Sequence, residues 1–218
     1  MAARRDYFDG CGAAHALDLV GERWALLVVR ELVLGPKRFT DLRTGLPHAS
    51  PNVLSQRLRE LEDAGVLRRR RLPPPAASAV YELTEWGQEL EPVLQALGRW
   101  AARSLPESDG IKVDSFILSL RTMFVPERAA DTDVTLQLVL DDQPFRVHLA
   151  QGALEIERGE LSGADVTVRC SPSLLAGVVY QGLPVADARA DGSLVLTGDP
   201  AALDALVDSV QLPEPLPV

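Results

Sequence analysis

Polar residues at helical spacing in the segment SPNVLSQRLRELEDAG are suited to hydrogen bonding with DNA bases. At about 100° per residue, Asn52, Gln56 and Arg59 share one side of a helix. Apolar residues occupy the other side: Leu54, Leu58 and Leu61. In the major groove, the amides of Asn and Gln match adenine and the guanidinium of Arg matches guanine. The pattern predicts a base-reading helix, although any amphipathic surface helix also turns polar residues outward.

The residues around this segment predict a helix-turn-helix. Ser50 is a good N-cap, Pro51 fits the first helical position, and Gly65 stands where the helix should end. Upstream, RFTDLRTGLP predicts a short helix with Phe39 and Leu42 on its inner side and a turn at its Gly and Pro. Two helices joined by a turn, with the second facing outward, are the usual arrangement for reading the major groove.

Four consecutive arginines, Arg68 to Arg71, follow this helix directly and precede the strand VYELT. In a winged helix-turn-helix, a hairpin in this place touches the DNA backbone. Because a strand alternates its faces, about half of the arginines can point the same way. A solvated charge run is the alternative, but the position beside the base-reading helix favours phosphate contact. The expected DNA contacts are Arg38, Ser50, Asn52, Ser55, Gln56, Arg59, Arg68, Arg69, Arg70 and Arg71.

Charge divides the 218 residues into two unlike parts. Residues 1–106 carry 15 Lys and Arg against 13 Asp and Glu, a net charge of +2, whereas residues 107–218 carry 7 against 18, a net charge of −11. The cations therefore collect in the part that is predicted to bind DNA. The acidic part is expected to face away from DNA.

The composition predicts a globular protein without a membrane segment. Hydrophobic residues make up 46% of the chain and charged residues 24%. No apolar run approaches the roughly 20 residues that span a bilayer, and the segment MAARRDYFDGCG lacks the apolar core of a signal peptide. Cys11 and Cys170 match no metal-ligand spacing. We therefore expect a cytoplasmic protein without a metal, another cofactor or a structural disulfide.

Residues 11 to about 105 resemble the HxlR-type winged-helix regulators of bacteria. The resemblance rests on the segments CGAAHALDLVGERWALLVVREL, GPKRFTDLRTGLPHASPNVLSQRLRELEDAGVLRRR and YELTEWGQEL. It implies a homodimeric transcription regulator, usually a repressor, that binds a double-stranded DNA operator. The stretch LPPPAASAV in the expected wing departs from the family, because it is longer and richer in Pro and Ala.

The helix expected after Thr84 also favours a homodimer. In EWGQELEPVLQALGRWAARSL, apolar residues recur at helical spacing: Leu90, Leu94, Leu97 and Trp100 or Ala101. Such a helix has more apolar surface than one small domain needs, and helix-turn-helix proteins usually read paired half-sites as dimers. The alternative is a helix that only covers its own domain.

Cys11, at the start of the first expected helix, is the candidate redox residue. Some HxlR-type regulators use a Cys near this position to sense oxidants or electrophiles, so the resemblance permits a thiol switch. The alternative, which we favour from the sequence, is a small packed side chain.

Beyond about Ile111 apolar and polar residues alternate, which predicts an antiparallel sheet. Strands are expected in VTLQLVL, FRVHLA, ALEIER, ADVTVRCS and GSLVLTG, with turns at DDQP and QGA. Helices are expected in PSLLAGVVYQG and in DPAALDALVDSV, which begins with a capping Asp199. The fold class is therefore α+β, with a winged-helix domain in residues 1–106 and a second domain in residues 111–212.

The second half resembles the sterol carrier protein-2-like domain in the segments GALEIERGELSGADVTVRCSPSLLAGVVYQG and DGSLVLTGDPAAL. Domains of that type form an apolar cavity between a sheet and its helices, so the resemblance implies a hydrophobic small-molecule effector. The side chains expected to line the cavity are Leu136, Leu138, Phe145, Val147, Leu154, Ile156, Val178 and Val179. The same residues would be needed to build a solid core, in which case the domain serves dimer contacts.

Enzyme chemistry is not indicated by the sequence. His15, His48 and His148 lie in unrelated contexts, and there is no Gly-rich phosphate loop or nucleophile elbow. We expect a DNA-binding transcription regulator, in the first place a repressor controlled by a hydrophobic small molecule. A regulator with a thiol switch at Cys11 and a lipid-binding carrier are the alternatives, and a carrier should not retard DNA.

Overall fold

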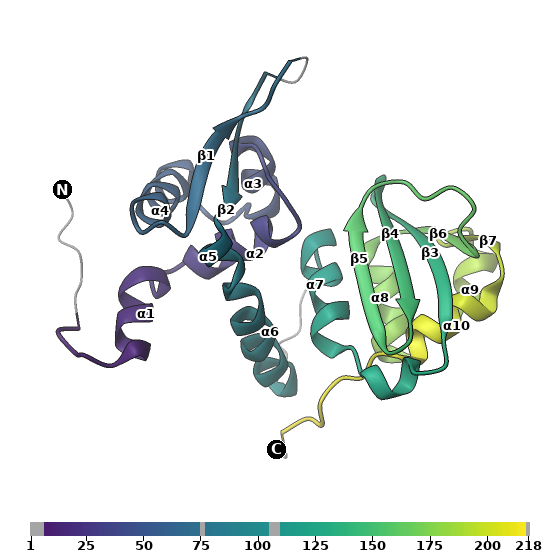
Figure 1. The fold of residues 1–218 in the computed structure, drawn as a ribbon. Coiled ribbons are helices and arrows are strands. Elements are labelled where there is room, and N and C mark those ends of the chain that lie inside the picture. The colour runs from purple at the N-terminus through teal and green to yellow at the C-terminus, as the bar shows by residue number, and fades with distance from the viewer. Residues whose placement is uncertain (1–6, 75–76, 105–109, 217–218) are drawn as a thin grey trace. The chain divides into compact units, whose positions relative to one another are not determined.

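The computed structural model describes residues 7–74, 77–104 and 110–216 (Figure 1). The chain divides into two compact units, Met1–Leu94 and Gln95–Val218. Helix α6, Leu90–Ala101, begins in the first unit and ends in the second.

The first unit combines short helices with a two-stranded hairpin. Its helices are α1 (Gly12–Val20), α2 (Ala25–Val33), α3 (Phe39–Gly45), α4 (Pro51–Asp63) and α5 (Glu85–Gln88). The hairpin consists of β1 (Leu67–Arg71) and β2 (Ala79–Leu83), which pair antiparallel. The order of two helices, a hairpin and a following helix confirms the winged helix-turn-helix that the sequence predicts.

Helix α4 forms where its caps and apolar spacing predict it. Ser50 Oγ accepts a hydrogen bond from the Val53 amide at 3.3 Å, and Pro51 occupies the first turn. The chain leaves the helix through Gly65, whose φ of +74° favours glycine. The inward leucines are at most 1% exposed: Leu54, Leu58 and Leu61. Burial of this stripe holds the helix on the unit and leaves its polar side outward.

Two details of the first unit concern single residues. Trp24 precedes α2 in a left-handed conformation with φ of +79°, so the helix begins at Ala25. Gly45, expected in the turn, is the last residue of α3, where a Cβ would lie 2.2 Å from Glu31 Oε2. Glycine is therefore needed at this position because a side chain would collide with the buried Glu31 carboxylate, and not because the chain turns here.

The second unit contains a five-stranded sheet with helices. The strands are β3 (Asp133–Leu140), β4 (Gln143–Ala150), β5 (Ala153–Arg158), β6 (Val166–Cys170) and β7 (Val195–Gly198), in the order β5-β4-β3-β6-β7. The helices are α7 (Val113–Met123), α8 (Pro172–Gln181), α9 (Val185–Ala190) and α10 (Pro200–Asp208). Short 3₁₀ turns follow α6 at η1 (Ala102–Ser104) and α7 at η2 (Pro126–Ala129).

The sheet is mixed, which corrects the purely antiparallel prediction. Strands β3, β4 and β5 form the expected antiparallel meander, but β6 pairs with β3 in parallel. The chain crosses from the edge strand β5 to the far side of β3, and this crossing sets the direction of β6.

A second correction concerns α7, because the expected alternation does not begin at Ile111. Its buried side chains instead recur at helical spacing: Val113, Phe116, Ile117 and Leu120.

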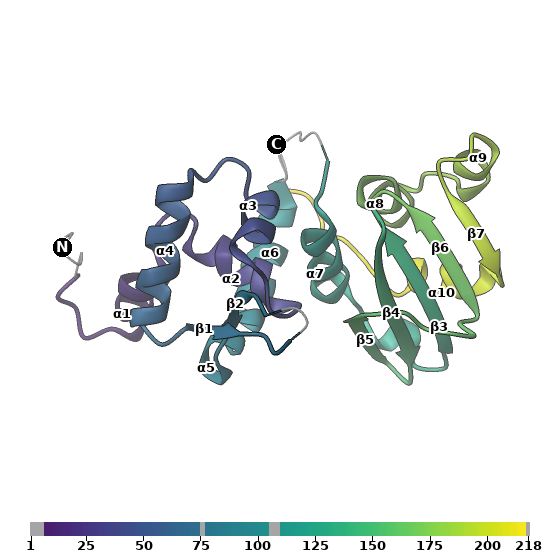
Figure 2. The ribbon, with the colours of Figure 1, turned by 90° about the horizontal axis from the view of Figure 1, so that it is seen from above.

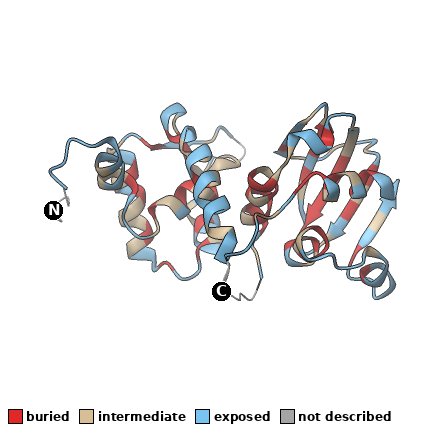
Figure 3. Cartoon of the chain, turned by 90° about the horizontal axis from the view of Figure 1, so that it is seen from below, coloured by how far each residue is buried: buried red, intermediate tan, exposed pale blue. Residues whose placement is uncertain are grey.

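Helices α8 and α10 cover one face of the sheet (Figure 2). Side chains on that face form the core: Leu136, Leu138, Leu140, Phe145, Val147, Leu149, Val166 and Val168. The opposite face carries exposed charges such as Arg146, Glu155 and Glu157. Figure 3 shows the resulting distribution, with buried residues along the strands and on the inner sides of the helices. One apolar and one polar face are usual for a sheet that has helices on one side.

Candidate nucleic-acid interface

The outer side of α4 presents the residues predicted to read bases. Asn52 and Arg59 are exposed, whereas Ser55 and Gln56 are half-buried. Gln56 Nε2 donates to Glu60 Oε1 at 2.9 Å, and Arg59 Nε donates to the Ser55 carbonyl at 3.3 Å. These local hydrogen bonds hold both side chains against the helix. A base contact by Gln56 must therefore exchange the Glu60 bond for a bond to the base.

Arg57 has a structural role that the sequence did not reveal. Its side chain is only 11% exposed and forms ion pairs with Glu60 and, at 3.7 Å, with Glu22 before α2. The pairs join α4 to the segment between α1 and α2. A side chain with two carboxylate partners positions the helix and is a poor candidate for contact with DNA.

Arg38 and Ser50 stand at the beginnings of the two helices of the helix-turn-helix. The Arg38 amide donates to Asp41 Oδ2 at 3.0 Å, and the Arg38 side chain is exposed. Ser50 is also exposed, but its hydroxyl caps α4. Both positions are accessible to a phosphate, as the helix N-termini of such motifs commonly are.

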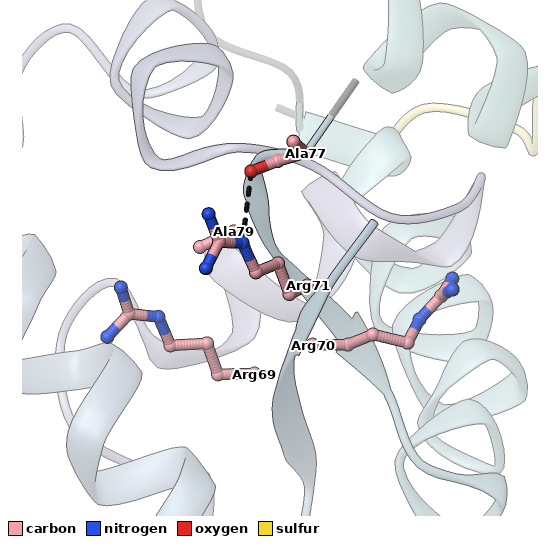
Figure 4. Close-up of a pocket in the computed structure, with 5 residues that line it drawn as sticks. All are labelled: Arg69, Arg70, Arg71, Ala77 and Ala79. Atoms are coloured by element: carbon pink, nitrogen blue, oxygen red, sulfur yellow. Dashed lines mark hydrogen bonds between the residues drawn. The ribbon is translucent and has the colours of Figure 1, made fainter. Parts of the chain in front are cut away.

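The arginines of β1 fall into two pairs on opposite faces of the hairpin. Arg68 Nε donates to Glu82 Oε1 at 2.7 Å and Arg70 Nε donates to Glu82 Oε2 at 2.8 Å. Arg69 and Arg71 alternate with them, and Figure 4 shows Arg69 and Arg70 extending to opposite sides of the strand. Among the described residues, neither Arg69 nor Arg71 forms an ion pair with a carboxylate.

A shallow hollow lies beside the outer part of the hairpin (Figure 4). It is lined by Arg69, Arg70, Arg71, Ala77 and Ala79. Arg71 Nε donates to the Ala77 carbonyl at 3.2 Å, which holds this guanidinium near the wing loop. The Pro- and Ala-rich loop was expected to depart from the family, and its residues 75–76 lie outside the described ranges. The guanidinium groups of Arg69 and Arg71 lie on one side of the strand, and exposed guanidinium groups are suited to binding an anion such as a phosphate.

A buried carboxylate fixes the hairpin to the helices. Glu31 of α2 is 1% exposed and accepts hydrogen bonds from Arg30 Nη2 at 2.8 Å and Lys37 Nζ at 2.6 Å. Burial alone would raise the pKa of Glu31, but the charges of Lys37 and Arg30 hold it below its ordinary value. The Lys37 amide donates to the Tyr81 carbonyl at 3.0 Å, and the Tyr81 amide donates back at 2.8 Å. Glu31 thereby positions β2 through Lys37.

The apolar residues predicted to line a ligand cavity lie in the core of the second unit. Seven of them are at most 8% exposed: Leu136, Leu138, Phe145, Val147, Ile156, Val178 and Val179. Leu154 is half-buried. They come from β3, β4, β5 and α8.

The two cysteines have different environments. Cys11 is exposed at the start of α1, where the backbone N–H groups of Ala14 and Ala13 lower the pKa of its thiol. Burial and the charge of Asp141 raise the pKa of the Cys170 thiol to about 11. Cys11 is therefore the more easily ionised thiol.

Within the described ranges, no group of three or more His, Cys, Asp or Glu side chains is placed to hold a metal ion. In those same parts of the chain, no helix has both the length and the apolar character that crossing a bilayer requires.

Two known families match the chain, one in each half. Residues 19–109 match the family described as HxlR-like helix-turn-helix, and residues 101–216 match the family described as alkyl sulfatase C-terminal. The second match is to a family with a different description, so it does not confirm the sterol carrier protein-2-like domain that the sequence suggested.

The relatives of the first half include transcription regulators of Bacillus subtilis. The HTH-type transcriptional regulator YvaP is 38% identical over 93 residues, which are 43% of this chain and 86% of YvaP. The HTH-type transcriptional regulator YodB is 35% identical over 96 residues, which are 44% of this chain and 86% of YodB. The solved structure of the reduced form of YodB covers 45% of this chain and 98% of its own, with 35% identity and a TM-score of 0.40.

Proposed function

The chain belongs to the HxlR-like helix-turn-helix family through residues 19–109 and to the alkyl sulfatase C-terminal family through residues 101–216. We propose that it is a repressor whose binding to DNA is controlled by a ligand. Its relatives YvaP and YodB are HTH-type transcriptional regulators, and DNA-binding regulation of transcription is the function of this chain as well. We propose in addition that the active protein is a homodimer and that its effector is an apolar small molecule.

The arrangement of α4 beside the hairpin is the observation that supports DNA contact by particular residues. Asn52, Ser55, Gln56 and Arg59 lie on the side of α4 opposite its buried leucines. In our proposal α4 enters the major groove and these side chains contact base edges. Exposed cations at the ends of the site contact the backbone and fix the register: Arg38, Arg69 and Arg71.

We propose that the active form is a homodimer joined in part through α6. Val93, Leu97 and Trp100 follow one another at helical spacing on this helix, and they are 53%, 46% and 73% exposed. A continuous exposed apolar stripe is typical of a protein–protein contact. A second copy is the natural partner, since helix-turn-helix proteins read two half-sites by two-fold symmetry.

Sedimentation of the full chain tests the assembly. We expect a dimer for the wild type and a shift toward the monomer for Leu97→Asp, because a charge in a buried apolar contact is costly. Glu155→Gln, at an exposed position of β5, serves as the control and should leave the dimer intact. A wild-type protein that sediments as a monomer at micromolar concentration would contradict the homodimer.

We further propose that the second unit senses an apolar small molecule, as a sterol-carrier-like domain would. The supporting feature is the group of buried aliphatic side chains that the sheet and α8 contribute to the core. Such side chains can line a site for an apolar ligand. A ligand that prefers one arrangement of the dimer must change DNA affinity by its differential binding free energy, typically about 1–3 kcal/mol.

Thermal-shift screening of the full chain with hydrophobic small molecules tests this effector role. A ligand should raise the melting temperature and change the affinity for DNA, and DNA should change the affinity for the ligand by the same factor. If compounds that bind leave DNA affinity unchanged, the second unit is a structural domain.

A second candidate function is thiol sensing through Cys11, favoured by the exposed thiol and its lowered pKa. In this candidate, hydrogen peroxide oxidises the Cys11 thiolate to a sulfenic acid, with loss of DNA binding that a thiol reductant restores. Cys11→Ser should abolish the response and Cys170→Ser should keep it. Equal responses of both variants would exclude Cys11 as the sensor.

We assign no catalysed reaction to the chain, because its relatives are named as transcription regulators. The family matched by residues 101–216 is named after an enzyme, so alkyl sulfate hydrolysis is the reaction to test. Release of sulfate from dodecyl sulfate by the purified protein would contradict this assignment.

A further inference from the structure

The wing of the first unit contains an acidic residue between two of its arginines. Glu82 lies directly opposite Arg68 in the register of the hairpin, and its side chain is 12% exposed. Each carboxylate oxygen accepts a hydrogen bond from a different arginine, Oε1 from Arg68 and Oε2 from Arg70. One carboxylate thus binds two guanidinium groups in the manner in which a phosphate would bind them.

The other two arginines have a different environment. Arg69 and Arg71 lie on the same strand face as the buried Leu67, opposite to the face of Arg68 and Arg70. The described residues supply no carboxylate partner for either guanidinium. Their cations remain available to an external anion on the face of the hairpin opposite to Glu82.

We propose that Glu82 determines which wing arginines bind DNA phosphates, and thereby limits sequence-independent binding. This inference rests on the proposed role of α4 and the hairpin in DNA contact. Glu82 retains the exposed side chains of Arg68 and Arg70 in an ion-pair cluster on one face of the hairpin, while Arg69 and Arg71 contact the DNA backbone. The internal carboxylate competes directly with a phosphate for the same donors.

Competition by Glu82 lowers the affinity for every DNA sequence, random DNA included. Phosphate contacts supply essentially all of the affinity for random DNA, whereas base contacts add the discrimination. Two further phosphate contacts would tighten binding to random and cognate sequences alike. A larger share of the protein would then be bound to non-specific sites elsewhere in the genome.

The dependence of affinity on salt measures the number of phosphate contacts. Each contact contributes about 0.9 to the slope of log K against log salt concentration. Two contacts therefore change the loss of affinity between 50 and 200 mM salt by about tenfold. Fluorescence anisotropy of the full chain with a random-sequence duplex gives this slope directly.

We expect Arg69→Ala/Arg71→Ala to reduce the slope by about two and Arg68→Ala/Arg70→Ala to leave it unchanged. Glu82→Gln should increase it by about two, and adding Arg68→Ala/Arg70→Ala to Glu82→Gln should restore the wild-type value. Glu89→Gln makes the same change in net charge at an exposed position outside the two strands of the hairpin. It is the matched control and should have the wild-type slope.

Two results would overturn the inference. The first is an equal reduction by both arginine pairs in the wild-type background, which would mean that DNA displaces Glu82. The second is a Glu82→Gln slope equal to that of Glu89→Gln. If Glu82→Gln does not fold, the comparison of the two arginine pairs decides alone. Absence of salt-dependent binding by the wild type is a different result, because it would refute the proposed DNA interface itself.

Discussion

Replacement of Glu31 by Gln should destabilise the first unit more than any other single charge neutralisation among its described acidic residues. Glu31 is the buried acceptor for both Lys37 and Arg30. Gln has nearly the same size, so the space beside Gly45 stays filled and only the charge is lost. Removing one partner of a buried ion pair costs about 3–5 kcal/mol, because the remaining charge is buried without compensation. The partner side chains retain 15% and 20% exposure, so we expect a loss near the lower end, about 3 kcal/mol.

Urea unfolding followed by tryptophan fluorescence measures this loss. Two of the three tryptophans, Trp24 and Trp86, lie in the first unit, so the signal reports mainly on it. The exposed Glu89→Gln is the control and should change the free energy of unfolding by less than about 0.5 kcal/mol. An equally small effect of Glu31→Gln would refute the reasoning about the buried network.

The pH dependence gives the same prediction an independent test. Because the pKa of Glu31 is lowered in the folded state, its stabilising effect is complete above its ordinary value of 4.5. The stabilisation is lost as the pH falls through the lower folded-state pKa, where the carboxylate becomes protonated. The difference between wild type and Glu31→Gln should therefore be largest near neutral pH and shrink below about pH 4.5. A constant difference down to acidic pH would mean that the charge of Glu31 contributes nothing.

Three further predictions follow from the two units. Gln56→Ala and Arg59→Ala should each weaken binding to a cognate site by about 1–3 kcal/mol and relax specificity, which competition with mutated duplexes would measure; unchanged discrimination would exclude the residue as a base reader. Gly198→Ala should lower the melting temperature of the second unit, because φ is +105° there and a Cβ would lie 2.2 Å from the Asp165 carbonyl oxygen. Burial raises the pKa of Tyr180 to about 12, so its tyrosinate absorbance should be missing at pH 11 in the folded protein and appear on unfolding.

Local signals in the sequence were sufficient to predict helix α4. The cap at Ser50, the proline after it and the leucine stripe act within one helix, so no distant contact is needed to interpret them. The two hairpin turns of the second unit were predictable for the same reason. Both contain residues that tolerate positive φ, which are Asp141 and Asp142 in the first turn and Gly152 in the second.

Features that depend on distant contacts were not predictable from the sequence. The parallel pairing of β6 with β3 is decided by the path of the chain across the sheet, and α7 was missed because its helical spacing was assigned to an alternating region. In the site, alternation predicted that only half of the arginines share a face. The sequence did not identify Glu82 as the partner of Arg68 and Arg70. This pairing depends on the register between β1 and β2, which places Glu82 opposite Arg68. The burial of Glu31 depends on the close approach of α3 at Gly45.

Selection of binding sites from a pool of random DNA duplexes by the full chain is the most direct test of the central claim, that the chain reads DNA sequence through α4. Wild-type protein should enrich one motif with two-fold symmetric half-sites about one helical turn apart. Gln56→Ala should lose the base preference at the contacted position while it retains the rest of the motif. Enrichment of no motif, or of the same motif with undiminished preference by a protein that carries both Gln56→Ala and Arg59→Ala, would contradict the claim.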